Sequence, residues 1–214
     1  MSRLLIWLHQ MNDQHDPTPE PAHEEELFVT FANESRLSTP QAPDDTADLD
    51  RLERWLAASG LPVRAQPRRL REALPAFRDL RGLVREIARR ADRDERPTRA
   101  QVAALNRVMR DGLHYHVLRA TDDGAQFDMS QVGDDLDQAR SAIAGSLAHY
   151  LAEHDLDRLG VCASETCSWL FVDRSPGGRR RWCDMGTCGN RAKVARHRAR
   201  KSTVSPVPRS AAAG

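Results

Sequence analysis

The sequence predicts a mainly α-helical N-terminal domain, with room for short strands, followed by a small C-terminal module built from a hairpin and a helix. Apolar residues recur at helical spacing through most of residues 25–157. All four cysteines of the 214-residue chain lie between positions 162 and 188, and arginine is concentrated around and after them. The body is long enough to fold around its own core, whereas a module of about forty residues usually needs a metal ion or disulfides.

The net charge of +1 conceals an uneven distribution. Residues 158–201 contain 11 Lys and Arg against 3 Asp and Glu, a net charge of +8, whereas residues 1–157 contain 20 against 28, a net charge of −8. A basic end on an acidic body indicates binding to a polyanion. Attraction between the two parts of the same molecule is the alternative interpretation.

The first residues suggest neither a secretory signal nor a membrane anchor. The apolar run within residues 1–8 is too short for a signal peptide and has no small-residue cleavage site. No run approaches the roughly 18 apolar residues of a transmembrane helix. We therefore expect a cytoplasmic protein, in whose reducing environment clustered cysteines are more often metal ligands than disulfides. Residues 1–24 are expected to form a flexible leader, and translation could begin at Met1 or at Met11.

The body contains one short apolar segment and four stretches with helical periodicity. Residues 27–33 fit either a strand or the first turns of a buried helix, because periodicity does not separate the two over so short a run. The helical stretches begin at Asp48, Pro67, Pro97 and Asp134. Gly60 and Pro62 end the first of them.

Individual residues refine this description. Pro75 is expected to kink or divide the long stretch of residues 67–93. A strand over residues 115–118 and a turn at Asp123-Gly124 are expected before the last helix. The residues of the third helix that are expected to face the core are Val102, Leu105, Val108 and Met109. Arginines on the body's helices are expected to be solvated or paired with its many acids.

The cysteines form two pairs of equal spacing. Four residues separate Cys162 from Cys167 and Cys183 from Cys188, and fifteen residues lie between the pairs. Two such pairs are typical of a tetrahedral four-thiolate zinc site, with each pair on a tight turn and zinc–sulfur distances of about 2.3 Å. Cysteine fills every ligand position, so a structural zinc ion is expected. Another metal, an iron–sulfur cluster or a redox disulfide are the alternatives.

The residues around the cysteines predict a hairpin and a helix. Residues 168–173 are rich in strand formers, residues 175–178 form a turn, and residues 179–182 return toward the second pair. After Cys188 come good helix formers without proline. The fourth ligand is therefore expected at a helix N-terminus, where the positive end of the helix dipole suits a thiolate. Together these elements describe a treble-clef-like zinc finger.

The predicted C-terminal helix is strongly basic. Ala192, Ala195 and Ala199 share one face, which is expected to pack on the hairpin and leave the basic side chains outward. An exposed basic helix suits nucleic acid, because arginine makes bidentate contacts with phosphate or guanine, and Asn190 could read an adenine edge. A solvated helix, or one docked on the acidic body, is the alternative. The candidate contacts are Arg179, Arg180, Arg181, Asn190, Arg191, Lys193, Arg196, Arg198, Arg200 and Lys201.

Few other side chains suggest chemistry. Asn33 and Arg36 could line a ligand pocket, although a helix cap or a salt bridge explains them as well. We expect the histidines to be hydrogen-bonded or exposed, because those of the last body helix are not at ligand spacing. We therefore do not expect an enzyme. The histidines considered for catalysis are His114, His116, His149 and His154.

The run Cys188-Gly189-Asn190-Arg191, with Trp182-Cys183 before it and Ala192-Lys193 after it, resembles the bacterial CGNR zinc finger family. The resemblance covers about residues 159–200 and includes the Phe171-x-Asp173 strand. Family members carry an N-terminal ABATE domain, which residues 27–150 resemble more loosely, with Glu34 where the family usually has Thr. The family is described as proposed stress-induced transcription regulators, so the resemblance implies a regulatory function.

These observations divide the chain into four parts: a leader (1–24), a mostly helical ABATE-like domain (25–157), a four-cysteine CGNR zinc finger (158–201) and a flexible tail (202–214). We expect one structural zinc ion and a DNA-binding transcription regulator, whose finger contacts nucleic acid and whose helical domain senses a signal or dimerises. Its expected partners are DNA or RNA, a second copy of the chain and an unidentified small-molecule effector, but no membrane. The alternative function is an RNA- or protein-interaction module with a structural zinc finger.

Overall fold

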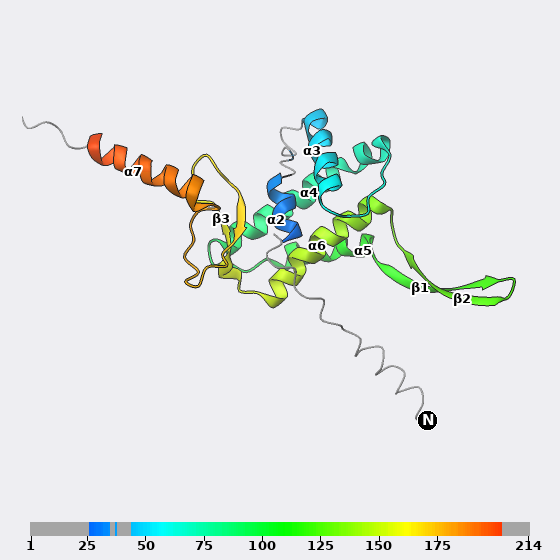
Figure 1. Cartoon of the computed structure of the whole chain (residues 1–214). Coiled ribbons are helices and arrows are strands. Elements are labelled where there is room, and N and C mark those ends of the chain that lie inside the picture. Colours follow the sequence, from blue (N-terminus) through cyan, green and yellow to red (C-terminus); the bar gives the residue numbers. More distant parts are fainter. Residues whose placement is uncertain (1–25, 35–36, 38–43, 203–214) are drawn as a thin grey trace, which may run out of the picture.

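The computed structural model describes residues 26–34, 37 and 44–202 (Figure 1). Most of the expected leader and tail, both candidate start methionines and Arg36 lie outside these residues. The helices are α2 (Leu27–Glu34), α3 (Asp45–Ala58), α4 (Pro67–Ala91), α5 (Arg99–Asp111), α6 (Asp135–Glu153), the short η1 (Leu156–Arg158), the π-helical turn η2 (Met185–Gly189) and α7 (Asn190–Ser202). The strands are β1 (His114–Thr121), β2 (Gly124–Gln131), β3 (Leu159–Val161) and β4 (Leu170–Val172). The predicted fold class, a mainly helical body with a C-terminal hairpin-and-helix module, is confirmed.

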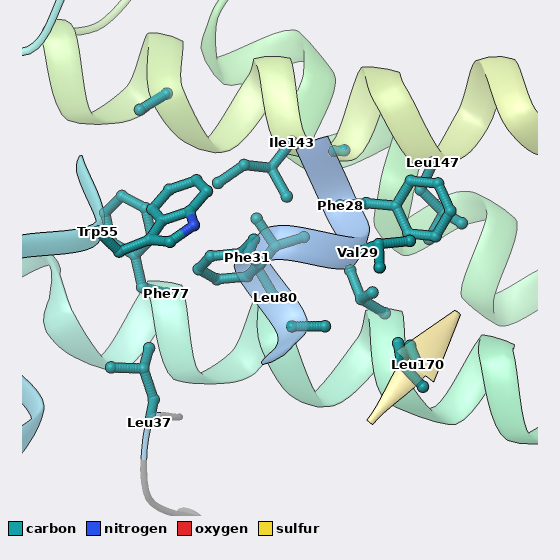
Figure 2. Close-up of a cluster of buried hydrophobic side chains, with 14 of the residues drawn as sticks. Phe28, Val29, Phe31, Leu37, Trp55, Phe77, Leu80, Ile143, Leu147 and Leu170 are labelled. Carbon is teal, nitrogen blue, oxygen red and sulfur yellow. The ribbon is translucent and has the colours of Figure 1, made fainter. Parts of the chain in front are cut away.

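The short apolar segment forms a helix at the centre of the core. Phe28 and Phe31 of α2 are fully buried between α4 and α6, and Leu170 of β4 lies in the same cluster (Figure 2). The ring of Phe31 lies 5.1 Å from that of Trp55, with an edge-on geometry that favours aromatic pairs. A helix that is apolar on most sides is stable only when other elements surround it, as they do here.

Helix α4 is continuous through Pro75, so the proline does not divide it. Apolar residues on both sides of the proline, such as Leu74 and Phe77, pack into one core, and this burial outweighs the one backbone hydrogen bond that proline cannot donate. The same helix buries Arg78. Its guanidinium donates to the carboxylates of Asp48 at 2.7 Å and Asp45 at 2.8 Å, as expected for a body arginine paired with acids.

Helix α5 begins with a capping box between Thr98 and Gln101. Gln101 and Leu105 are buried, and Val108 and Met109 pack against the core, but Val102 is 44% exposed. The prediction for Val102 was therefore wrong. The capping box places Gln101 on the inward face and turns its neighbour toward solvent.

The expected strand at residues 115–118 is part of a longer hairpin. β1 pairs antiparallel with β2, from His114 opposite Gln131 to Thr121 opposite Gly124. The hairpin extends away from the helices in a different direction from α7 (Figure 1). One of its faces carries exposed apolar side chains, including Leu118 and Phe127, which lie opposite each other.

The C-terminal hairpin is formed by β3 and β4, with Leu159 opposite Val172 and Val161 opposite Leu170. The predicted pairing of residues 168–173 with residues 179–182 is therefore wrong. β3 offers Leu159 for burial in the body's core, whereas residues 179–182 offer three arginines that are exposed. Leu159 and Leu170 belong to one hydrophobic cluster with the helical body.

Across the described residues, every helix is too short or too polar to pass through a lipid bilayer.

Candidate metal centre and nucleic-acid interface

The four cysteines lie together at the end of the β3–β4 hairpin. Their Sγ atoms are all within 4.8 Å of one another, and Cys183 Sγ lies 3.7 Å from Cys167 Sγ and 3.8 Å from Cys188 Sγ. A tetrahedral zinc ion with bonds of about 2.3 Å places its sulfurs about 3.8 Å apart, whereas a disulfide bond is only about 2.05 Å long. The geometry fits four zinc ligands.

The first pair of cysteines lies on the tight turn between β3 and β4. The amide of Cys162 donates to the carbonyl of Trp169 at 2.9 Å, which continues the strand pairing, and the amide of Cys167 donates to Ser164 O at 2.9 Å, which closes the turn. Gly160 faces the ring of Phe171, where a Cβ would lie 2.8 Å from Cζ. These contacts fix the turn that carries the first two cysteines.

The second pair is held by η2. Asp184 caps this turn, because its Oδ1 accepts from the amide of Thr187 at 2.6 Å and its carbonyl accepts from Gly189 N at 3.0 Å. Cys188 follows within the turn, which leads directly into α7. The fourth ligand thus lies at the start of a helix, as the sequence predicts.

Contacts between the two pairs fix the start of α7. The amide of Ala163 donates to Arg181 O at 2.9 Å, and Arg191 Nη1 donates to Thr166 Oγ1 at 2.9 Å. The buried carboxylate of Asp173 accepts from the amides of Ser175 at 2.9 Å and Arg180 at 2.7 Å, so it closes the intervening loop. The start of α7 is therefore held by residues that neighbour the metal ligands in sequence.

Burial raises the pKa of the Cys167 and Cys183 thiols. Four neighbouring thiolates also repel one another, so they require a cation at their centre. Zinc supplies this charge and keeps all four sulfurs deprotonated. Because no ligand position remains for water, the site is suited to a structural role. The four cysteines form a site for a single structural zinc ion.

The finger is held against the helical body by polar side chains that reach across. Asn33 is 4% exposed, its Nδ2 donates to Leu170 O at 2.8 Å, and its Oδ1 accepts from Leu170 N at 2.8 Å. Asp92 accepts from the amide of Val161 at 3.1 Å. Asn33 therefore pairs with β4 as a neighbouring strand would. The sequence left a ligand pocket, a helix cap or a salt bridge open for Asn33 and did not predict this contact.

Arg85 is a buried cation at the same junction. It donates to Ala32 O at 3.4 Å and to Ser168 O at 2.6 Å. Burial, together with the charge of Arg89, lowers the pKa of Arg85, and the sulfur of Cys167 opposes this shift. A zinc ion held by the four thiolates would carry a net charge of −2, and the sulfur of Cys167 would bring part of this charge near Arg85. No sequence pattern marked this residue.

The candidate nucleic-acid residues lie on α7 and on the segment before the second cysteine pair. Arg179, Arg180 and Arg181 are exposed, as is every described side chain of α7 except the half-buried Ala192. The expected packing of Ala195 and Ala199 on the hairpin is therefore wrong, because the hairpin packs against the body instead. The side chain of Lys201 lies outside the described residues.

Several of these side chains also make contacts within the finger. Asn190 Nδ2 donates to Gly186 O at 2.9 Å, and Arg180 donates to the carbonyls of Trp182 and Cys183. The guanidinium carbons of Arg181 and Arg196 lie 5.5 and 6.0 Å from the centre of the Trp182 ring. Trp182 thus joins the arginine-rich segment to the first turns of α7.

The histidines form no comparable centre. His116 stacks on Phe127 in the β1–β2 hairpin at 4.8 Å, and His149 and His154 lie with their rings 6.2 Å apart at the end of α6. Within the described part of the chain, the four cysteines are the one group whose ligand atoms converge on a common point.

The chain has a helical body, a closed four-cysteine site and a basic helix. This is the architecture of the class of zinc-finger proteins that have an additional N-terminal domain. Comparison with family models places the chain within that class. The model of the CGNR zinc finger matches residues 158–201, and the ABATE model, described as "Putative stress-induced transcription regulator", matches residues 25–154. The chain belongs to the ABATE family and carries a CGNR zinc finger. No curated protein shows significant similarity to it.

Proposed function

We propose that this protein is a DNA-binding transcription regulator in which the zinc finger directs α7 toward DNA. The observation that supports the proposal best is the charge of α7. It contains six Lys or Arg and no Asp or Glu: Arg191, Lys193, Arg196, Arg198, Arg200 and Lys201. The helix extends from the body without covering it (Figure 1). Such a helix suits the phosphate backbone and the base edges of a duplex.

The dimensions of α7 match those of a DNA groove. Its 13 residues span about 20 Å at 1.5 Å per residue. The major groove of B-DNA is about 12 Å wide and admits one helix, whereas the deep, narrow major groove of double-stranded RNA does not. The geometry therefore favours DNA over duplex RNA, and RNA or protein binding is the outcome that would replace this proposal.

The helical body is the proposed sensing or dimerising part. Leu118 and Phe127 are 68% and 65% exposed on one face of the β1–β2 hairpin, and Met129 is 59% exposed on the same face. A two-stranded hairpin alone is only marginally stable in water, so a second copy of the chain packed on this face would stabilise it. Dimerisation would present two basic helices to two half-sites. Cytoplasmic location and the absence of catalysis complete the proposal.

The proposal is tested by the salt dependence of DNA binding. If the finger makes about four phosphate contacts, the logarithm of affinity should fall with the logarithm of salt concentration with a slope near −3.6. Arg196→Ala with Arg200→Ala should reduce this slope by about 1.8. A matched control is Arg54→Ala with Arg68→Ala, because both residues are exposed body arginines in helical ion pairs. Fluorescence anisotropy with a random duplex measures both. Equal slopes in the two double variants, or tighter binding to single-stranded RNA, would reject the proposal.

A further inference from the structure

A cleft of about 860 Å³ lies between the helical body and the zinc finger. Its body side is formed by Val29 and Asn33 of α2 and by Arg81 and Arg85 of α4, and its finger side is formed by both cysteine turns and β4. Small-molecule sites commonly measure roughly 300–1,000 Å³ and occur between domains. The cleft therefore has the size and the position of a ligand site.

The lining of the cleft has an excess of positive charge. The acids that line it are Glu26, which pairs with Arg174 at 3.4 Å, and Asp184, which accepts from Thr187. Its five arginines are Arg81, Arg85, Arg174, Arg180 and Arg191. When the charge of −2 of a zinc tetrathiolate centre is included, the lining retains a net charge of +1. This excess of positive charge favours an anionic ligand.

Two of these arginines have donors suited to a ligand. Arg85 is 7% exposed, and its hydrogen bonds go to the carbonyls of Ala32 and Ser168, while none of the ion pairs of the described residues includes it. Arg191 contributes one donor to Thr166. A guanidinium has five N–H donors, so each can also contact a carboxylate. A buried cation gains most from such a partner, because little water competes for it.

One part of the cleft is apolar and lies beside polar residues such as Ser168 and Thr187. Trp169, which is 37% exposed, lines it together with Val29, Leu170 and Val172. Indole and aliphatic side chains contact an apolar or aromatic group and do not solvate a bare inorganic anion. The combination selects a molecule that has one anionic group and a flat apolar body.

We propose that this cleft binds a small aromatic monocarboxylate, with the carboxylate between Arg85 and Arg191 and the ring against Trp169. The ligand would contact α4 and the finger at once. Binding in this cleft would not depend on DNA, because both sides of the cleft belong to the protein itself.

Isothermal titration of the zinc-loaded full chain with benzoate tests the inference. We expect saturable binding of one benzoate per chain. The uncharged isostere benzamide and the small anion acetate should each bind at least tenfold more weakly, because one lacks the charge and the other lacks the ring. Binding should change the fluorescence of Trp169, and this change should disappear in Trp169→Phe.

Arg85→Met should weaken benzoate binding at least tenfold. Arg191→Ala should also weaken it, and this residue is exposed, so the result does not depend on an altered core. Arg68→Ala, on the exposed side of α4, should bind as the wild type does. Absence of saturable benzoate binding, equal binding of benzamide, or unchanged affinity in Arg191→Ala would each overturn the inference. Loss of DNA binding with benzoate binding intact would reject the proposed function alone.

Discussion

At the residue scale, the junction between body and finger depends on side chains that form hydrogen bonds with buried backbone N–H and C=O groups. The amide of Asn33 supplies one donor and one acceptor to Leu170, and among the residues that the structure describes no strand other than β3 pairs with β4. A buried N–H or C=O without a partner costs about 1–3 kcal/mol. The side chain of Asn33 therefore stabilises the junction by pairing two buried backbone groups.

Asn33→Leu should lower the free energy of unfolding by about 2–4 kcal/mol, because it leaves the N–H and the C=O of Leu170 unpaired in a buried place. Urea denaturation of the zinc-loaded protein measures the change. Thr30→Val is the matched control on the same helix, where the hydroxyl donates to the carbonyl of Leu27 within its own turn. Its effect should stay below about 1 kcal/mol. Wild-type stability of Asn33→Leu would contradict the role assigned to Asn33.

Asp134 caps α6 and pairs with Arg69. Its Oδ1 accepts from the amides of Leu136 and Asp137 at 3.0 Å, and its Oδ2 accepts from Arg69 at 2.5 Å. Burial opposes ionisation, but the hydrogen bond from Arg69 and those from the backbone outweigh it and lower the pKa of Asp134 below its ordinary value. A carboxylate with a depressed pKa in the folded state stabilises the fold above its unfolded pKa, and this stabilisation is lost as pH falls through the folded pKa.

Asp134→Ala should therefore destabilise the protein by about 0.5–2 kcal/mol at neutral pH, the usual effect of removing a helix cap. The difference from wild type should begin to shrink below about pH 4, the ordinary pKa of an Asp, because the unfolded chain then takes up protons, and it should be lost once the folded carboxylate is protonated at still lower pH. Chemical denaturation of both proteins across this range measures the difference, and zinc release at low pH affects both alike. If the stability difference between Asp134→Ala and wild type grew on acidification, the carboxylate of Asp134 would not stabilise the fold in the way described.

At the scale of elements, features set by neighbouring residues could be predicted from the sequence, whereas the pairing of strands could not. The cysteine spacing predicted the zinc ligands because each pair lies within one turn. The approximate limits of the body helices followed from breakers such as Gly60 and Pro97. The partner of β4 could not be predicted from residues 168–182. β4 pairs with β3, which lies outside that segment and is held in place by the burial of Leu159 in the body's core. The contacts of Asn33 and Arg85 with the finger could not be predicted either, because the residues that they contact are distant in sequence.

The β1–β2 hairpin offers a test of dimerisation. Leu118→Ser with Phe127→Ser should remove the apolar face on which a second copy is proposed to pack, so the double variant should be monomeric under conditions where the wild type is dimeric. Analytical ultracentrifugation measures both. Thr121→Ser with Gln126→Ser, on the opposite face of the same hairpin, is the matched control and should leave the dimer intact. A monomeric wild type would contradict this assignment.

At the scale of the whole molecule, the finger and the body are joined by one core. Leu159 and Leu170 pack with the helices of the body, and the same hairpin carries two of the zinc ligands. We therefore expect metal binding to stabilise the body as well as the finger, because the β3–β4 hairpin contacts α2 and α4. The boundary at residue 158 divides the sequence but does not divide this core.

Cys183→Ser should unfold the segment that leads to α7 and also increase amide hydrogen exchange in α2, which contacts β4. Exchange should remain slow in α5, on the far side of the body. Hydrogen–deuterium exchange of zinc-loaded wild type and variant measures both. Ser164→Ala, within the first turn but not a ligand, is the control. Unchanged exchange in α2 would show that finger and body are independent.

The central claim is that the zinc site directs α7 toward DNA. Titration of the ¹⁵N-labelled, zinc-loaded protein with duplex DNA, followed by amide chemical shifts, tests it most directly. The largest changes should occur in residues 179–182 and in α7, with small changes in α3 and α5. Changes confined to the helical body or to the β1–β2 hairpin would contradict it.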